Sequence, residues 1–65
     1  MPSRVIRTFQ YDPVEQYLDV VFVSWRRYRY HRVPEEIYDS MRRAFSKGWF
    51  FNQHVRDNFR CTRVH

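Results

Sequence analysis

Hydrophobic and polar side chains alternate in three short segments of the N-terminal half of the chain, which is the pattern of half-buried strands. These segments cover residues 5–9, 17–23 and 27–32. Asp12 and Pro13 separate the first two, because proline presets a turn angle and aspartate can hydrogen-bond the backbone two residues on. A loop longer than two residues is expected between the second and third, since no glycine or asparagine is available there for a tight hairpin. The sequence therefore predicts a three-stranded antiparallel meander.

The alternation also assigns side chains to the two faces of this predicted sheet. One face takes the apolar and tyrosine positions of the second and third strands: Leu18, Val20, Phe22, Tyr28 and Tyr30. The other face takes a more polar set: Tyr17, Asp19, Val21, Arg27, Arg29 and His31. Because an antiparallel sheet can bury one face and leave the other in water, we expect the first set to face the core.

Helical spacing replaces alternation after residue 33. Pro34 suits the first position of a helix, and Glu35 and Glu36 complement its positive end. The buried stripe of this helix is expected at five positions: Ile37, Tyr38, Met41, Ala44 and Phe45. Gly48, the only glycine, is predicted to end the helix in the left-handed conformation.

A second short helix is predicted after this corner. Phe51, Val55 and Phe59 stand four residues apart, and Asn52 is placed to cap the helix start. Gly48 and Asn52 are thus expected to be structural corner residues. Strands that precede the helices, rather than alternating with them, indicate an α+β domain in which both helices pack on one face of the sheet. Residues 60–65 show no clear pattern and are interpreted as a basic tail.

A chain of 65 residues has room for one domain, with a core at about residues 5–59. A small chain can build only a small core, and the 20% aromatic content offsets this because each ring buries about 150–250 Å². Cys61 is the only cysteine, so no internal disulfide is available. No signal peptide or membrane-spanning segment is evident, and we expect a cytoplasmic protein that does not contact membranes. A monomer and a homodimer both fit these observations.

Several segments between residues 6 and 59 form a recognisable set: IRTFQYD at 6–12, LDVVF at 18–22, YRY at 28–30 with VP at 33–34, and SKGWFFN at 46–52 with VRD at 55–57. They resemble KTSC domains, a family named after a domain at the C-terminus of some lysyl-tRNA synthetases. The chain departs from the family pattern at Ser24-Trp25, where such domains commonly have a glycine-containing turn. It departs again at Arg60, where a proline is common.

The resemblance implies properties beyond those of the residues alone. KTSC domains occur by themselves in small bacterial and phage proteins and also as an appendage of a synthetase. The appended setting implies contact with RNA, and the family implies no established enzymatic activity. The resemblance therefore supports the fold more strongly than it supports any one function.

Arginine dominates the basic side chains, because Lys47 is the only lysine among 12 basic residues and the net charge is +5. Guanidinium groups suit phosphates and carboxylates, so the expected partner is nucleic acid, RNA more than DNA, or an acidic protein surface. One predicted binding group lies along the third strand and the loop before it: Trp25, Arg26, Arg27, Arg29 and Arg32. A second lies near the corner: Arg42, Arg43, Lys47 and Arg56, with Arg60 beyond. The alternatives are a solvated sheet face that protects its edge and, for Arg56 with Asp57, a structural ion pair.

Protein interaction is the alternative function, because tryptophan, tyrosine and arginine dominate the residues that contribute most to interface affinity. Trp25 and Trp49 lie in or beside predicted loops. Trp49, Phe50 and Phe51 are consecutive, so all three rings cannot point inward and at least one is expected to project. Such a ring suits a phage-type inhibitor or an adaptor that binds a larger host complex.

Catalysis and metal binding have little support in the sequence. The Ser46–Gly48 segment lacks the glycines of a phosphate-binding loop. The candidate ligands lack metal-site spacing: His31, His54, Cys61 and His65. A chain this small also has little volume for a substrate cleft. We therefore predict a non-enzymatic binding domain with no cofactor, no metal and no catalytic residue.

Overall fold

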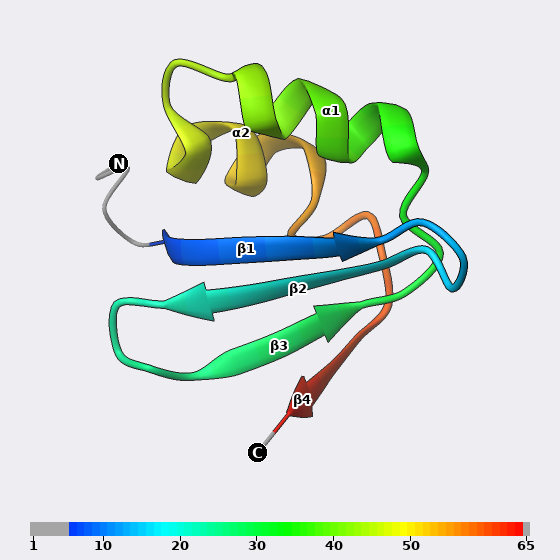
Figure 1. The fold of residues 1–65 in the computed structure, drawn as a ribbon. Coiled ribbons are helices and arrows are strands. Elements are labelled where there is room, and N and C mark those ends of the chain that lie inside the picture. Colours follow the sequence, from blue (N-terminus) through cyan, green and yellow to red (C-terminus); the bar gives the residue numbers. More distant parts are fainter. Residues whose placement is uncertain (1–5, 65) are drawn as a thin grey trace.

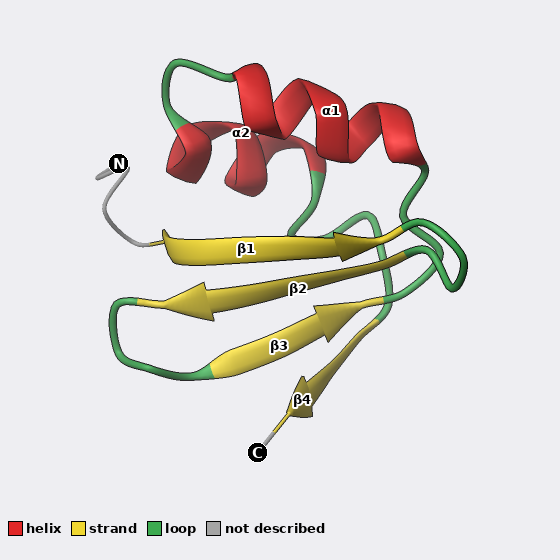
Figure 2. Cartoon of the chain, in the orientation of Figure 1, coloured by secondary structure: helices red, strands yellow, loops and turns green. Residues whose placement is uncertain are grey.

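The computed structural model describes residues 6–64, and its elements follow the order expected of an α+β domain. They are β1 (Ile6–Asp12), β2 (Tyr17–Phe22), β3 (Arg27–Tyr30), α1 (Glu35–Arg43), α2 (Lys47–His54) and β4 (Cys61–Val64). The strands form one antiparallel sheet in the order β1-β2-β3-β4, with both helices on the same side (Figures 1 and 2). The predicted α+β class is confirmed, but the sheet has four strands and not three. The predicted strand residue Val5 and the tail residue His65 lie outside the described residues.

The fourth strand, β4, is the element that the sequence did not predict. It pairs antiparallel with β3, with Tyr30 opposite Cys61 and Arg27 opposite Val64. Its first three residues are exposed and only Val64 is partly buried. Because β4 forms an edge held by backbone pairing, its side chains carry no alternating apolar pattern, and residues 61–64 appear in sequence as a featureless tail.

The predicted faces of β2 and β3 are confirmed. Leu18 and Val20 are fully buried and Tyr30 is 5% exposed, while Phe22 and Tyr28 are partly buried against the same core. The polar set lies on the other side, because Asp19 stands opposite Arg29 and Val21 opposite Arg27. The period of two along each strand therefore decided which side chains are available to solvent.

The turns of the meander form largely as predicted. Asp12 Oδ1 accepts hydrogen bonds from the backbone N–H groups of Val14, at 2.9 Å, and Glu15, at 3.2 Å. This aspartate turn lies at the end of β1, which continues three residues beyond its predicted end at Phe9. The loop of residues 23–26 is longer than a two-residue hairpin, as expected, and it is held by a 2.8 Å hydrogen bond from Trp25 N to the Phe22 carbonyl.

The first helix begins at Glu35, with Pro34 one position outside it, and ends at Arg43. Met41 is fully buried, and Ile37 and Tyr38 pack against the core, as the apolar stripe predicted. Phe45 was assigned to the same stripe, but it is fully exposed at 106%. The helix ends before Phe45, so helical spacing no longer directs that ring inward.

The prediction that Gly48 ends the first helix in the left-handed conformation is wrong. Gly48 lies inside α2, is buried, and no described glycine has a positive φ. Ser46 is the residue that caps α2, because its hydroxyl accepts a 3.3 Å hydrogen bond from Trp49 N. Asn52, predicted as the cap, lies within the helix. The corner therefore falls at residues 44–46, a few positions earlier than expected.

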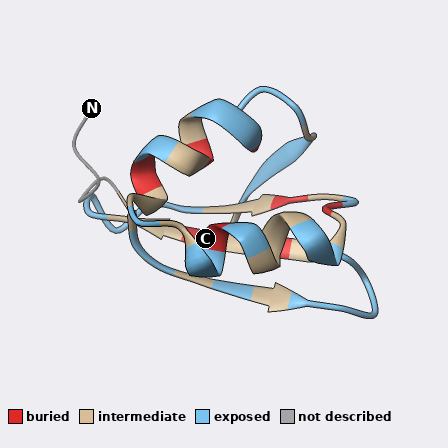
Figure 3. Ribbon diagram, turned by 90° about the horizontal axis from the view of Figure 1, so that it is seen from above, coloured by how far each residue is buried: buried red, intermediate tan, exposed pale blue. Residues whose placement is uncertain are grey.

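The two helices cover different strands of the sheet. Tyr38 of α1 packs on β1, stacking on Tyr11 at 4.8 Å and meeting Phe9 edge-on at 5.9 Å between ring centroids. Phe51 of α2 packs on the central strands, 5.5 Å from Phe22 and 5.3 Å from Tyr30. The buried residues accordingly lie on both helices and on the strands beneath them (Figure 3). We call the opposite side of the sheet the open face; it carries Thr8, Gln10, Tyr17, Asp19, Val21, Arg27, Arg29, Thr62 and Val64.

Candidate nucleic-acid interface

The centre of the open face holds an intramolecular ion pair. Arg29 and Asp19 stand directly opposite each other on β3 and β2. Arg29 Nε lies 2.9 Å from Asp19 Oδ1, and Nη2 lies 3.1 Å from Oδ2. The same guanidinium carbon lies 4.4 Å from the ring centroid of Tyr17. The hydrogen bond to Asp19 raises the pKa of Arg29 above its usual value. Arg29, predicted to bind phosphate, therefore already has a carboxylate and an aromatic partner.

Three arginines and a tryptophan surround the loop of residues 23–26 at one end of β3. Trp25, Arg26, Arg27 and Arg63 line an open depression of about 380 Å³. Trp25 is 64% exposed, and the Arg7 guanidinium carbon lies 3.9 Å from the centroid of its ring. Arg7 reaches the ring because the pairing of β1 with β2 shifts between Ile6 and Thr8, and such bulges redirect side chains. Arg7 and Arg63 were not among the predicted binding residues.

Trp25 has a φ of 68°, in the left-handed region that favours glycine. This is the position at which the chain departs from the glycine-containing turn of similar domains. A tryptophan in this conformation costs about 1 kcal/mol or more relative to glycine. Backbone strain of this kind is common at functional sites, and here it presents an exposed aromatic ring beside Arg26 and Arg27.

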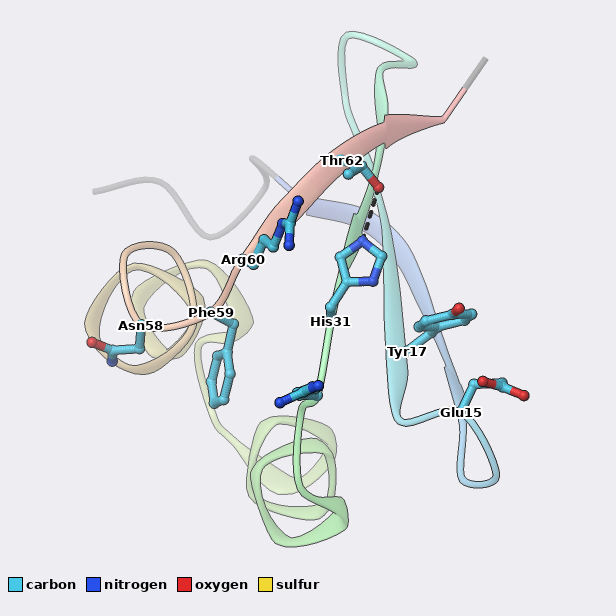
Figure 4. A pocket seen from close by; sticks show the side chains of 8 residues that line it. Glu15, Tyr17, His31, Asn58, Phe59, Arg60 and Thr62 are labelled. Carbon is cyan, nitrogen blue, oxygen red and sulfur yellow. Dashed lines mark hydrogen bonds between the residues drawn. The ribbon is translucent and has the colours of Figure 1, made fainter.

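The other end of β3 leads into an open pocket of about 840 Å³ (Figure 4). We call it the end pocket; its lining residues are Glu15, Tyr17, His31, Arg32, Asn58, Phe59, Arg60 and Thr62. The backbone N–H of His31 donates a 2.8 Å hydrogen bond to the Arg60 carbonyl. This bond joins the two chain segments that form most of the pocket, one after β3 and one before β4. Arg32 has a φ of 56°, so a second predicted binding residue lies in the left-handed region.

Most of the end pocket was missed in the sequence. Arg32 was predicted as a binding residue, and Arg60 only as an extension of the second group. Tyr17, His31 and Phe59 were not assigned to any site. Tyr17 and His31 come together through the predicted pairing of β2 with β3, whereas Phe59 and Arg60 join the pocket because β4 returns beside β3, which is the pairing that the sequence did not predict. The alternation of residues 27–32 did place His31 on the same face as Arg27, and that was the available signal.

The second predicted group lies on the helical side of the molecule. Arg42 Nη2 lies 2.9 Å from Asp39 Oδ1, and this hydrogen bond lowers the pKa of Asp39 below its usual value. Lys47 Nζ donates a 2.9 Å hydrogen bond to the Ala44 carbonyl at the end of α1. Both cations therefore stabilise the helix corner, as favoured at a helix C-terminus. Arg43 is exposed on the same helix.

Arg56 lies apart from both groups. It lines a smaller depression of about 320 Å³ between α2 and the strands, together with Phe22, Tyr28 and Tyr30. The predicted ion pair of Arg56 with Asp57 is not formed, since the ion pairs among residues 6–64 are Arg29–Asp19 and Arg42–Asp39. Burial raises the pKa of Tyr30 in this region.

The helix corner presents apolar side chains to solvent. Phe45 is fully exposed and Trp49 is 53% exposed, whereas Phe51 is 3% exposed. The expectation that at least one of the consecutive rings 49–51 projects outward is therefore confirmed. Trp49 lies 6.3 Å from the ring of His54, which leaves most of its surface available.

Within residues 6–64, no three His, Cys, Asp or Glu side chains are grouped so that they could hold a metal ion. No helix in this part of the chain is long and apolar enough to cross a membrane.

An antiparallel sheet with two helices on one side defines a small α+β domain, and several known proteins are similar to this chain in sequence. A protein of Tsukamurella paurometabola is 40% identical over 62 residues, covering 95% of this chain and 92% of that protein. An uncharacterized protein of Stutzerimonas stutzeri is 42% identical over 53 residues, covering 82% of this chain and 75% of that protein. A lysine–tRNA ligase of Nostoc punctiforme is 34% identical over 60 residues, which cover 92% of this chain but 11% of the ligase.

The crystal structure of a KTSC domain protein from Yersinia pestis has the same fold. Its TM-score is 0.92 at 32% sequence identity, covering 100% of this chain and 90% of that chain. The KTSC domain family model matches residues 2–59. The chain therefore belongs to the KTSC domain family, as its sequence resemblance predicted.

Proposed function

We propose that this KTSC domain is a non-enzymatic module that binds single-stranded RNA along β3, from the loop of residues 23–26 at one end to the end pocket at the other. The observation that carries the proposal is the distribution of exposed cations from one end of β3 to the other. Arg26 and Arg27 lie at the loop end, and Arg32 lies at the end pocket. We call these three residues the β3 track. Three residue steps at about 3.3 Å each give β3 a length of roughly 10 Å, and Arg26 and Arg32 lie beyond its two ends.

The chemistry of the track suits a flexible phosphate backbone. Arg26, Arg27 and Arg32 are exposed and form no ion pair with residues 6–64. Their guanidinium groups can each donate two hydrogen bonds to one phosphate. Trp25 at one end offers an exposed ring on which an unpaired base can stack, and base stacking contributes about 1–3 kcal/mol. A base in a duplex has no free face, so a single strand is the favoured ligand.

RNA is proposed rather than DNA because a similar segment occurs in a lysine–tRNA ligase, a protein whose name contains an RNA substrate. A cytoplasmic location is part of the same proposal. The free and exposed Cys61 is in keeping with a reducing compartment, where thiols stay unpaired.

The direct test is fluorescence anisotropy of the purified protein with labelled single-stranded RNA, single-stranded DNA of the same sequence, and duplex RNA, across a salt series. We expect saturable binding to the RNA strand that weakens steeply with salt, because cations of the track displace counterions from phosphates. Arg27→Ala is expected to weaken binding about threefold and to reduce the salt slope by about 0.7, the contribution of one phosphate contact on a single strand.

Arg43→Ala is the matched control, since Arg43 is an exposed arginine on the helical side. Its affinity should stay close to that of the wild type. Equal losses in both variants would indicate attraction by net charge without a track. The absence of saturable binding at low salt would contradict the proposal as a whole.

Docking of a protein at the helix corner is the second candidate function, and the exposure of Phe45 and Trp49 favours it. Large exposed aromatic side chains next to arginine are typical of interface residues that contribute strongly to affinity. An acidic protein surface is the expected partner, because Arg43 is exposed at the end of α1, two residues before Phe45 in the chain. In this role the domain would act as an adaptor or inhibitor of a larger complex, or would form a homodimer.

Affinity purification with mass spectrometry distinguishes the two functions. A partner that survives nuclease treatment, is lost in Trp49→Ala and persists in Arg27→Ala would favour docking at the corner. A partner that nuclease removes would favour RNA. Sedimentation of the wild type and of Trp49→Ala tests the homodimer separately, because only self-association through the corner is sensitive to that substitution.

A further inference from the structure

The end pocket is a concave site, whereas binding of a strand along a flat sheet would need no such pocket. It lies where the β3 track stops, between the residues that follow β3 and those that precede β4. The hydrogen bond from His31 N to the Arg60 carbonyl fixes these two segments side by side. A strand that follows the track toward Arg32 therefore meets a concave wall at this end.

The charges in the pocket favour an anion. Arg32 and Arg60 come from the two joined segments, are exposed, and form no ion pair with residues 6–64. Glu15, in the turn between β1 and β2, is the one carboxylate among the lining residues. Two guanidinium groups against one carboxylate leave net positive charge for a ligand.

The rest of the pocket wall is largely aromatic. Tyr17 and Phe59 stand on either side of the His31 ring (Figure 4). The rings of Tyr17 and His31 meet edge to face with centroids 5.3 Å apart. His31 Nε2 lies 2.9 Å from Thr62 Oγ1, which holds the imidazole ring in place. Ordered rings of this kind offer stacking surface at a low cost in side-chain entropy.

We propose that the end pocket binds a nucleotide that carries a terminal phosphate. Arg32 and Arg60 hold the phosphate, and the base lies against the wall of Tyr17, His31 and Phe59. The inference rests on the proposed RNA-binding function, which it extends from a strand in general to a strand with a phosphorylated end.

A terminal phosphate matches this pocket better than an internal one. A phosphomonoester carries about −1.5 to −2 charges at neutral pH and presents three acceptor oxygens, whereas an internal phosphodiester carries one charge. Two arginines can therefore each pair with a different oxygen edge of the same group. Glu15 opposes this attraction, so its removal is expected to strengthen binding.

The test compares labelled single-stranded RNA oligonucleotides with a 5′-phosphate, with a 3′-phosphate, and with neither. We expect one phosphorylated end to raise the affinity about threefold over the unphosphorylated strand, which is the effect of one exposed ion pair. Arg60→Ala should abolish this preference, and Glu15→Gln should increase it. Arg63→Ala is the matched control, because it removes an exposed arginine from the same strand, β4, outside the pocket, and it should keep the preference.

A free nucleotide has the same chemistry as the end of a strand, so a second arm uses adenosine monophosphate alone. Backbone amide shifts of the isotope-labelled protein should move saturably at Arg32, Phe59 and Arg60. Adenosine and inorganic phosphate, tested separately, should cause smaller shifts. Saturation at concentrations like those of the phosphorylated strand would identify a free nucleotide as the ligand, and much weaker saturation would identify the strand end.

The two proposals fail in different ways. Equal affinity of all three oligonucleotides, without amide shifts in the pocket, would overturn the nucleotide pocket and leave RNA binding by the β3 track intact. Loss of the terminal-phosphate preference in Arg63→Ala, or its retention in Arg60→Ala, would also overturn the pocket. If no oligonucleotide binds and adenosine monophosphate causes no shifts, both proposals are wrong.

Discussion

The two faces of the sheet are built from the same strands, yet one is buried under the helices and the other is open to solvent. On the covered face, Leu18 and Val20 are fully buried beneath the helices. On the open face, the residues that alternate with them include Asp19, Val21 and Arg27, which none of the helices covers. The covered face supplies the free energy of folding through apolar burial. The open face has little part in the core and carries the charges and rings of the candidate site.

The basic side chains differ in how many have partners on the helical side and on the strands, and the composition alone does not show this. On the helical side, Arg42 pairs with Asp39 and Lys47 binds the end of α1. On the open face Asp19 pairs with Arg29. The three residues of the β3 track form no ion pair with residues 6–64. A count of basic residues therefore overstates the cations that can reach a ligand. Three of the unpaired arginines, Arg26, Arg27 and Arg32, lie on β3 or just beyond its ends.

The largest expected effect comes from the covered face. Met41→Ala removes a fully buried side chain of α1 and should lower the free energy of unfolding by about 2–5 kcal/mol. Urea denaturation followed by circular dichroism measures it. Ser40→Ala, at an exposed neighbouring position, is the control and should change stability by less than about 0.5 kcal/mol. Similar stability of the two variants would contradict the assignment of the core.

Gly48→Val tests whether α2 packs closely at its first turn. Gly48 is buried within the helix, so a branched side chain should overpack the site and cost about 1–3 kcal/mol. The reason is crowding, since the backbone of Gly48 has no positive φ. Thermal melts give the measurement. A neutral result would mean that the space beside Gly48 accepts two methyl groups.

Arg32→Gly separates binding from stability on the open face. The substitution removes one cation of the β3 track, so RNA affinity should fall about threefold. Stability should change by less than about 1 kcal/mol, because glycine relieves the left-handed strain at Arg32 while it adds freedom to the unfolded chain. Anisotropy and thermal melts of the same sample test both statements. A large loss of stability would show that Arg32 supports the fold instead.

Asp19→Asn should strengthen RNA binding about twofold, because it removes a negative charge from the open face and releases Arg29. Both side chains of this pair are more than one third exposed, so little stability is expected to be lost with it. The salt dependence of anisotropy should steepen slightly in the variant. Weaker RNA binding would indicate that the Asp19–Arg29 pair orders the site and does not compete with the ligand.

The smallest effect is expected on the helical side and depends on pH. The pKa of Asp39 is lowered from its usual 3.8, first by the hydrogen bond from Arg42. The pair therefore stabilises the fold fully above pH 3.8 and loses this contribution as the pH falls through the lower pKa of the folded state. Wild type should exceed Asp39→Asn in melting temperature at neutral pH, and the two should converge in acid. Asp57→Asn, whose carboxylate pairs with none of residues 6–64, should show no such convergence.

The sequence predicted the elements that carry their own pattern. Alternation in β2 and β3 was sufficient to assign their side chains to the two faces of the sheet. Helical spacing placed Met41 and Phe51 in the core. The β4 strand was missed because an exposed edge needs no apolar alternation. The boundaries of α2 were misplaced because a serine cap at residue 46 and a buried glycine at residue 48 look locally like the end of the preceding helix.

The candidate site was predicted only in part, for a related reason. Arginine clustering marked Arg26, Arg27 and Arg32, which are exposed at the ends of β3 or just beyond them. Their availability was decided by distant partners: Asp19 engages Arg29 across two strands, and Arg7 reaches Trp25 from β1. The Arg56–Asp57 pair was expected from adjacency in sequence, yet it does not form.

The sequence by itself determined the fold class, the family, the buried face and the surplus of arginine, because each of these depends on residue type and local period. Tertiary structure decided the fourth strand, the end pocket and the set of free cations. Those features depend on which segments lie side by side after the chain has folded. Backbone pairing of β3 with β4 brings the segments before and after these strands side by side, so that Arg32 and Arg60 line the same pocket, and no local pattern along the chain encodes that arrangement.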